Sequence, residues 1–152
     1  MRSLFISIAL MIYMPARAEN CTHDASTFRC VKFVRNYDGD TVTVDIPNVH
    51  PLIGKNISVR VRHIDTPEIH GKNPCEKDAA RSARRLVENI LKHAKRIDLE
   101  NIGKDKYFRI LADVVADGKP ISEILLKNNL AYGYEGKTKE KVNWCSRLPA
   151  AQ

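Results

Sequence analysis

The order of hydrophobic periodicities along this chain constrains its fold more than any other feature of the sequence. Residues 41–46 and 57–64 alternate apolar and polar side chains, the period of two that is typical of a half-buried strand. Over residues 76–93 the apolar side chains instead recur at intervals of three and four, which predicts an amphipathic helix. This order indicates the α+β class, mainly β, with helices packed outside an antiparallel sheet.

Shorter patterns complete the expected elements. Strands are expected at residues 30–36, 96–100 and 108–116, a second helix from about Pro120, and a last extended segment at residues 130–134. Five short strands are compatible with a closed barrel carrying two packed helices, because closure removes exposed strand edges. The pattern alone does not distinguish such a barrel from an open sheet.

The first 18 residues have the composition of an export signal. Arg2 supplies a positive charge, residues 4–14 are an apolar run, and residues 16–18 carry the small side chains of a signal-peptidase site. A membrane-spanning helix needs roughly 20 apolar residues, which disfavours the alternative of an uncleaved anchor. We therefore expect cleavage near Ala18, which leaves a single domain of residues 19–152, without a membrane anchor, in the periplasm or outside the cell.

All four cysteines lie beyond this segment. An even number of cysteines behind an export signal favours two disulfides in an oxidising compartment, and the absence of a CxxC pair disfavours zinc. Three pairings are possible. We favour Cys21–Cys30 as a local link and Cys75–Cys145 as a long one, whose closed loop would stabilise the fold by roughly 4 kcal/mol in the chain-entropy model.

The chain is basic, with a net charge of +7. Loss of Arg2 and Arg17 with the signal segment would leave +5, because residues 1–18 contain no acid. A basic surplus favours a polyanionic partner such as nucleic acid. Solvated surface lysines explain the same surplus without any partner, so charge alone does not decide between the two interpretations.

Three short segments gather charged residues at the ends of expected strands. Asp38-Gly39-Asp40-Thr41 opens one strand, Arg60 precedes Asp65-Thr66-Pro67-Glu68 at the end of the next, and Asp105-Lys106-Tyr107-Phe108-Arg109 opens a third. An Asp-Gly turn by itself is common between strands. Charges in this number are seldom found at strand ends unless they meet a ligand.

These residue types suit the hydrolysis of a phosphodiester. Asp40 and Asp65, with the backbone carbonyl of Thr66, are hard oxygen ligands of the kind that calcium or magnesium prefers. Glu68 is the candidate base that orients or deprotonates water. Arg60 and Arg109 can each grip phosphate oxygens with a two-pronged guanidinium and bind the transition state more tightly than the substrate.

Aromatic and histidine residues near these segments have two interpretations each. Tyr107, Tyr132 and Tyr134 either stack on bases or pack at strand ends. His63 and His70 have no partner at ligand spacing, so we expect surface or structural histidines and no histidine-metal centre.

Together the three segments resemble the staphylococcal nuclease family, over roughly residues 31–134. The resemblance implies a five-stranded barrel of the oligonucleotide-binding (OB-fold) type, one bound calcium ion, and a sugar-non-specific nuclease that leaves 3′-phosphate and 5′-hydroxyl ends on DNA and RNA. The residues it assigns are Asp40, Asp65 and the backbone of Thr66 to the metal, Arg60, Glu68 and Arg109 to catalysis, and Lys106, Tyr107 and Tyr134 to substrate binding.

The sequence departs from the best-known family member at two points. Phe108 stands where that member has glycine, and a long C-terminal helix has no counterpart after Trp144 and Cys145. We expect the Cys75–Cys145 disulfide to replace the constraint of that helix.

The main alternative function is a non-catalytic nucleic-acid-binding module of the same fold. The charged set is complete, which favours the enzyme over that module. An adhesion or inhibitor domain held by disulfides is a third possibility, and it leaves the clustered charges unexplained. A monomer is expected.

Overall fold

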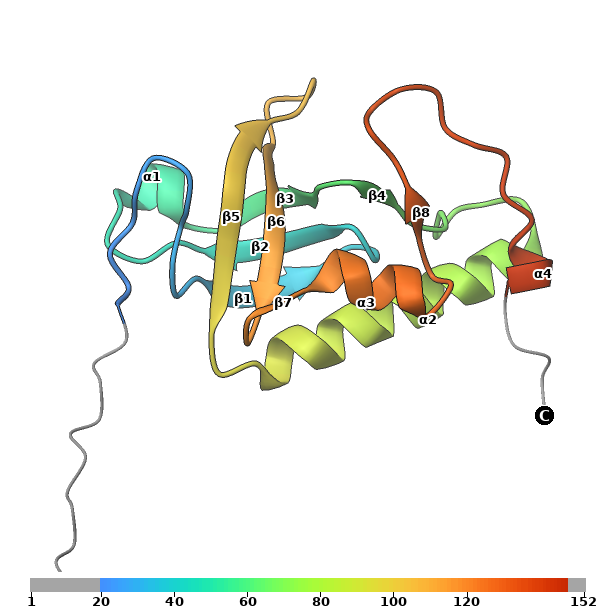
Figure 1. Cartoon of the computed structure of the whole chain (residues 1–152), viewed down its shortest axis with the longest axis horizontal. Coiled ribbons are helices and arrows are strands. Elements are labelled where there is room, and N and C mark those ends of the chain that lie inside the picture. Colours follow the sequence, from blue (N-terminus) through green and yellow to red (C-terminus); the bar gives the residue numbers. More distant parts are fainter. Residues whose placement is uncertain (1–19, 148–152) are drawn as a thin grey trace, which may run out of the picture.

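A six-stranded sheet forms the centre of the structure, which is a computed structural model describing residues 20–147 (Figure 1). The expected signal segment therefore lies outside the described residues. The sheet runs in the order β1-β2-β3-β6-β5, with β7 paired to β6. Its strands are β1 (Lys32–Asn36), β2 (Thr41–Asp45), β3 (Ile57–Val61), β5 (Ile97–Lys104), β6 (Ile110–Ala116) and β7 (Lys119–Pro120). The fold is α+β and mainly sheet, as the periodicities predicted.

The five-stranded barrel expected from the sequence is not confirmed, because the strand ladders form an open path with β1 and β5 at its ends. The chain just before β1 nevertheless lies against β5. Phe28 forms an isolated bridge with Leu99, and the Val31 amide donates to the Ile97 carbonyl at 2.9 Å. Cys30 between them has a φ of 56°, outside the extended region, so this edge segment and β1 are not one continuous strand.

A second, two-stranded sheet results from a break in an expected strand. Residues 57–64 were expected to be continuous, but His63 has a φ of 63°, which ends β3 and starts β4 (Ile64–Asp65). β4 pairs with β8 (Tyr132–Gly133), which places Tyr132 directly beside Asp65. The sheet was expected to be antiparallel, but it is mixed, because β3 pairs in parallel with β6. This pairing brings the third charged segment toward the second.

The longest helix, α2 (Pro74–His93), begins and ends at residues suited to helix termini. Asn73 caps its first turn by accepting from the Cys75 amide, Pro74 occupies the first turn, and basic residues occupy the last. Its apolar stripe is buried against the sheet at Ala83, Val87 and other positions, and Figure 1 shows the helix running along one side of β1 and β2.

Three further helices are shorter. α3 (Ile121–Lys127) corresponds to the second expected helix. The four-residue helices α1 (Pro51–Gly54) and α4 (Trp144–Arg147) were not expected, because single turns carry no readable periodicity. Among residues 20–147, no helix combines the length and apolar character needed to cross a bilayer.

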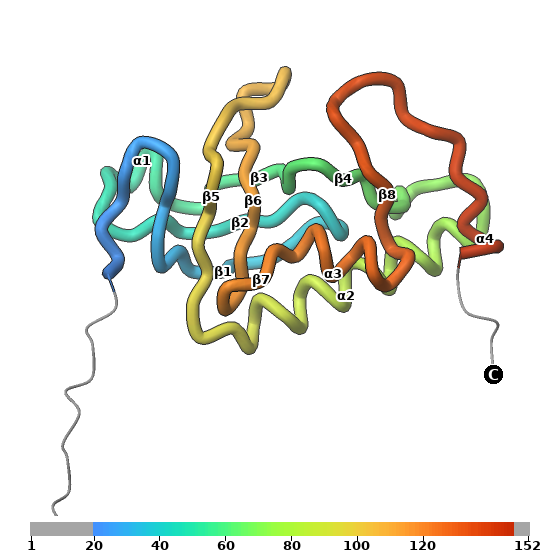
Figure 2. Tube along the Cα trace, in the orientation of Figure 1, coloured from blue at the N-terminus to red at the C-terminus, as the bar shows by residue number. Residues whose placement is uncertain are grey.

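Two disulfides join the same cysteines that the sequence favoured. Cys21–Cys30 links residues nine apart, and Cys75–Cys145 links residues 70 apart. The second bond fastens α4 to the first turn of α2, and the chain trace in Figure 2 accordingly returns from the end of a long loop to the start of that helix.

Candidate active site

A cavity of about 500 Å³ lies between the tip of the β5–β6 hairpin and the loop of residues 134–143 that follows β8. Figure 1 shows both projections on the same side of the molecule, flanking β3 and β4. All nine residues assigned from the sequence to metal, catalysis or substrate line this cavity. They come from four parts of the chain that only the folded topology brings together.

The turn before β2 positions Asp40. The Asp38 carboxylate accepts the amides of Asp40 and Thr41 at 3.0 and 2.7 Å, which fixes the turn. Gly39 is required there, because a Cβ would lie 2.8 Å from Thr66 Cγ2 and 2.9 Å from Ala83 Cβ. The close packing buries the Asp40 carboxylate at the floor of the cavity.

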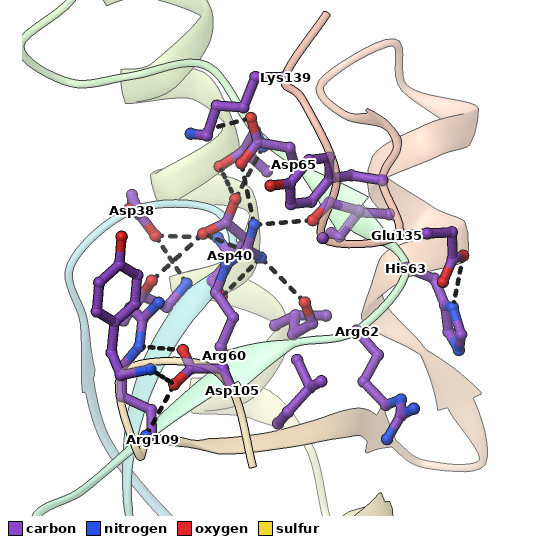
Figure 3. Close-up of a pocket in the computed structure, with 18 of the residues that line it drawn as sticks. Asp38, Asp40, Arg60, Arg62, His63, Asp65, Asp105, Arg109, Glu135 and Lys139 are labelled. Atoms are coloured by element: carbon purple, nitrogen blue, oxygen red, sulfur yellow. Dashed lines mark hydrogen bonds and ion pairs between the residues drawn. The ribbon is translucent and has the colours of Figure 1, made fainter. Parts of the chain in front are cut away.

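Asp40 and Asp65 meet at one guanidinium, that of Arg60 (Figure 3). Arg60 Nη1 lies 3.3 Å from Asp40 Oδ1, and Nη2 lies 2.9 Å from Asp65 Oδ1. The same two nitrogens donate to the carbonyls of Val61 and Ile64, each at 2.9 Å. Arg60 is thus held rigidly at the break between β3 and β4, with both buried aspartates beside it.

The charge of Asp40 is incompletely compensated. Burial raises the pKa of Asp40 well above its usual value, and the neighbouring Asp38 and Asp65 raise it further. Arg60 opposes the shift, as does the Thr66 hydroxyl, which donates to Asp40 Oδ2 at 2.9 Å. The Thr66 amide donates to the same oxygen at 2.8 Å. A buried carboxylate in this state favours the arrival of another positive charge.

Asp65 has two further partners, and one of them was missed from the sequence. The Tyr132 hydroxyl donates to Asp65 Oδ2 at 2.7 Å, and Lys139 Nζ lies 3.2 Å from the same oxygen. Lys139 also donates to Glu68 Oε1 at 2.6 Å. Partial burial alone would lower the pKa of Lys139, but its bonds to Glu68 and Asp65 raise it above its usual value. A lysine in an aperiodic loop gives no sequence signal for such a contact.

The tip of the β5–β6 hairpin presents Arg109 to the cavity. Asp105 accepts the amides of Tyr107 and Arg109 through Oδ1, and Arg109 Nε through Oδ2 at 2.7 Å. Partial burial would raise the pKa of Asp105, but these donors hold it below its usual value. Within residues 20–147 the Arg109 Nη groups make no hydrogen bond, so they can still take a ligand.

Two aromatic residues and a lysine continue this basic tip. The Tyr107 ring lies 5.2 Å from Lys106 Nζ and 5.6 Å from Arg109 Cζ. Tyr107 is largely exposed, as is Phe108, whose φ of 64° is unusual for a bulky side chain. The tip therefore combines cationic groups with aromatic faces next to the cavity.

The remaining tyrosines and histidines divide between site and surface. Tyr132 is buried, so of its two interpretations the structure favours packing, although its hydroxyl meets Asp65. Tyr134 lines the cavity and donates to the Lys137 carbonyl at 2.7 Å. His63 and His70 are both exposed, and His63 contacts Glu135.

The protein atoms of this cavity supply only part of the coordination shell that a hard divalent cation needs. Within the described residues, no group of three or more His, Cys, Asp or Glu side chains is arranged to hold a metal ion. Two buried carboxylates, Asp40 and Asp65, lie at one wall of the cavity, and Thr66 adds a backbone carbonyl in the same segment. Oxygen donors in this number suit calcium or magnesium with water completing the shell.

Comparison with known proteins places the chain among nucleases. A family model described as "Staphylococcal nuclease homologue" matches residues 58–152. "Endonuclease YncB" of Bacillus subtilis (strain 168) is 39% identical over 111 residues, which are 69% of this chain and 49% of that protein. "SPbeta prophage-derived endonuclease YokF" of the same strain is 37% identical over 111 residues, 69% of this chain and 35% of that protein.

A third relative matches over a longer stretch. An "Uncharacterized endonuclease" of Haemophilus influenzae is 29% identical over 141 residues, 93% of this chain and 70% of that protein. The chain thus spans half or less of the two Bacillus proteins and about two thirds of the Haemophilus one.

Proposed function

Because this chain belongs to the staphylococcal nuclease family, we propose that it hydrolyses phosphodiester bonds of DNA and RNA in the cavity between the β5–β6 hairpin and residues 134–143. One observation carries the proposal. The acids Asp40, Asp65 and Glu68 and the arginines Arg60 and Arg109 line a single cavity. A binding module needs the cations but has no use for the buried acids.

Asp40, Asp65 and the Thr66 carbonyl would hold one calcium ion. When bound, the ion supplies positive charge to a phosphate oxygen and lowers the pKa of nearby water. The exposed Glu68 carboxylate lies at the cavity edge, where it can accept a proton from the attacking water. General-base assistance of this kind contributes roughly 10²–10⁴-fold to the rate.

The arginines stabilise the charge that develops on the phosphate. Arg109 presents its Nη groups to the cavity while Asp105 fixes its Nε, so the guanidinium is oriented before substrate arrives. Arg60 is held beside Asp40 and Asp65 by carbonyl groups. Lys106, Tyr107 and Tyr134 line the cavity. Lys106 and Tyr107 would contact a neighbouring phosphate, and Tyr134 would be a further substrate contact.

These contacts recognise phosphate and aromatic faces, which all nucleotides share. We therefore propose action on both DNA and RNA with little regard for sequence. Attack of water on phosphorus with cleavage of the P–O5′ bond would leave 3′-phosphate and 5′-hydroxyl ends, as the family resemblance implies. The alternative remains a nucleic-acid-binding module without catalysis.

We further propose that the enzyme is an exported monomer released by cleavage near Ala18. Both disulfides require an oxidising compartment, such as the periplasm or the exterior. A site with few charged ligands binds calcium at about 10⁻⁴–10⁻³ M, so it would stay largely empty in cytosol and load after export.

The direct test incubates residues 19–152 with plasmid, single-stranded DNA and RNA, in calcium or in chelator. We expect calcium-dependent cleavage of all three. The new 5′ ends should accept phosphate from polynucleotide kinase without prior dephosphorylation. Retention of substrate without cleavage in calcium or magnesium would establish the binding module instead.

A further inference from the structure

Lys139 occupies a place in the cavity that the proposed mechanism does not use. Its ammonium lies 2.6 Å from Glu68 Oε1 and 3.2 Å from Asp65 Oδ2, and so joins the candidate base to a candidate metal ligand. Figure 3 shows the Lys139 side chain beside Asp65, on the side of the view away from Arg109. Arg60 contacts Asp40 and Asp65 but not Glu68, so Lys139 is the cation that Glu68 meets among the described residues.

We propose that Lys139 is a resident cation of this acid cluster, which a divalent metal ion must displace, so that the loop of residues 134–143 sets the metal concentration at which the enzyme loads. The inference rests on the proposed function, because it concerns the calcium site of Asp40 and Asp65. It adds a residue that determines metal affinity and is not itself a ligand.

Electrostatic repulsion requires that Lys139 leave Asp65 when the metal ion binds. An ammonium in contact with Asp65 and a divalent ion bound by the same carboxylate would lie a few ångströms apart, where like charges repel strongly in a partly buried site. Asp65 Oδ2 already accepts from Tyr132, and its other oxygen accepts from Arg60. The metal and Lys139 therefore compete for the remaining lone pairs of Asp65.

The fold keeps Lys139 near the cluster after displacement. At one end of its loop, the Tyr134 amide donates to the His63 carbonyl at 2.9 Å, and the Tyr134 hydroxyl bonds to Lys137. At the other end, Trp144 is buried beside Tyr132, and Cys145 is covalently tied to α2. Because the loop is fixed at both ends, the Lys139 ammonium competes with the metal ion at a high effective concentration.

The expected gain in calcium affinity depends on how exposed the side chains paired with Lys139 are. The Lys139 side chain is 50% exposed and Glu68 is 58% exposed, while Asp65 is only 6% exposed. Exposed pairs contribute little, so most of the competition arises at Asp65. Removing the ammonium should therefore tighten calcium binding by roughly three- to tenfold.

The test is calorimetric titration of calcium into metal-free protein without substrate. Lys139→Met should lower the calcium Kd by roughly three- to tenfold, and Lys139→Arg, which keeps the charge, should stay near wild type. Lys141→Met is the matched control, since Lys141 lies in the same loop, is exposed, and makes no ion pair within residues 20–147. It should bind calcium as the wild type does.

The outcomes separate this inference from the proposed function. A Lys139→Met protein that binds calcium no more tightly than wild type overturns the resident-cation role, while a wild type that binds and cleaves leaves the nuclease intact. An equal gain in Lys139→Met and Lys141→Met also overturns it, because net charge alone would then explain the change. If the wild type binds neither calcium nor magnesium, the metal site and the inference fail together.

Discussion

At the residue scale, Asp105 determines how Arg109 meets a ligand. Its carboxylate accepts two amides of the hairpin tip and the Arg109 Nε. Asp105→Asn keeps an acceptor for the amides but loses the charge that orients the guanidinium. A hydrogen bond to a charged group contributes about 1.5–3 kcal/mol, so kcat should fall about tenfold or more, with a small change in melting temperature.

Steady-state kinetics on single-stranded DNA provide the measurement. Asp113→Asn on β6 is the control, because Asp113 pairs with Asn101 outside the cavity. Equal losses in both variants would show that hairpin charge, and not the orientation of Arg109, is responsible.

Phe108 gives a prediction about stability. Its φ of 64° costs a residue with a Cβ about 1–2 kcal/mol, and its exposed side chain loses little packing when removed. Glycine avoids that cost but loses about 0.5–1 kcal/mol of chain entropy. Phe108→Gly should therefore stabilise the protein by about 0.5–1 kcal/mol in urea unfolding.

Phe108→Ala separates the two causes, because alanine removes the ring but keeps the unfavourable φ. It should be close to wild type in stability. A Phe108→Gly protein less stable than Phe108→Ala would mean that the hairpin tip does not hold this conformation in solution.

Site residues could be predicted from the sequence where they lie in short segments with several charged neighbours. Asp40, Asp65 and Arg109 each stand at a strand end beside other charges, and pairing of β3 with β6 brings these ends together. Lys139 could not be predicted in the same way. Its partners lie 71 and 74 positions away, and the contact depends on the path of an irregular loop.

At the element scale, periodicity predicted which residues face the core but not where strands stop. The apolar positions of β2 and β3 are buried as expected, apart from Ile57, which is half-buried. The interruptions occur at Cys30 and His63, whose positive φ values depend on tertiary contacts and carry no signal in hydrophobicity. The break at Cys30 separates β1 from the segment that lies against β5, so the expected barrel is not closed by one continuous strand. The break at His63 separates β3 from β4, which lies beside the site.

The turn between β1 and β2 leaves no room for a side chain at Gly39. Gly39→Ala would place a Cβ 2.8 Å from Thr66 and 2.9 Å from Ala83 of α2, so the turn and the helix must separate. Overpacking of this kind costs about 1–3 kcal/mol, and we expect that loss in the free energy of unfolding from urea denaturation.

Gly133→Ala in β8 is the matched control, because no atom lies within 4 Å of the added Cβ and its φ is ordinary. It should leave stability nearly unchanged. If Gly39→Ala is equally harmless, the close approach of this turn to α2 is not present in solution.

At the scale of the whole molecule, the Cys75–Cys145 disulfide ties α4 to the first turn of α2. It closes a segment of 70 residues, compared with nine for Cys21–Cys30. In the chain-entropy model the long link contributes roughly 4 kcal/mol and the short one less. Replacing Cys75 and Cys145 by alanine should lower the melting temperature more than replacing the short pair.

Differential scanning calorimetry compares the two double variants, with reductant added to the wild type as a third arm. An unchanged melting temperature after full reduction would show that neither bond constrains the unfolded chain. The pairing itself was one of three that the sequence allowed, and the fold distinguishes it by bringing α4 to the start of α2.

The central claim is that one cavity holds a cation at Asp40 and Asp65 while Glu68 activates water. The most direct measurement is the single-turnover cleavage rate of Glu68→Gln in saturating calcium, with DNA binding measured in parallel. We expect a rate lower by roughly 10²–10⁴-fold with DNA affinity retained. A variant that cleaves at nearly the wild-type rate would contradict it.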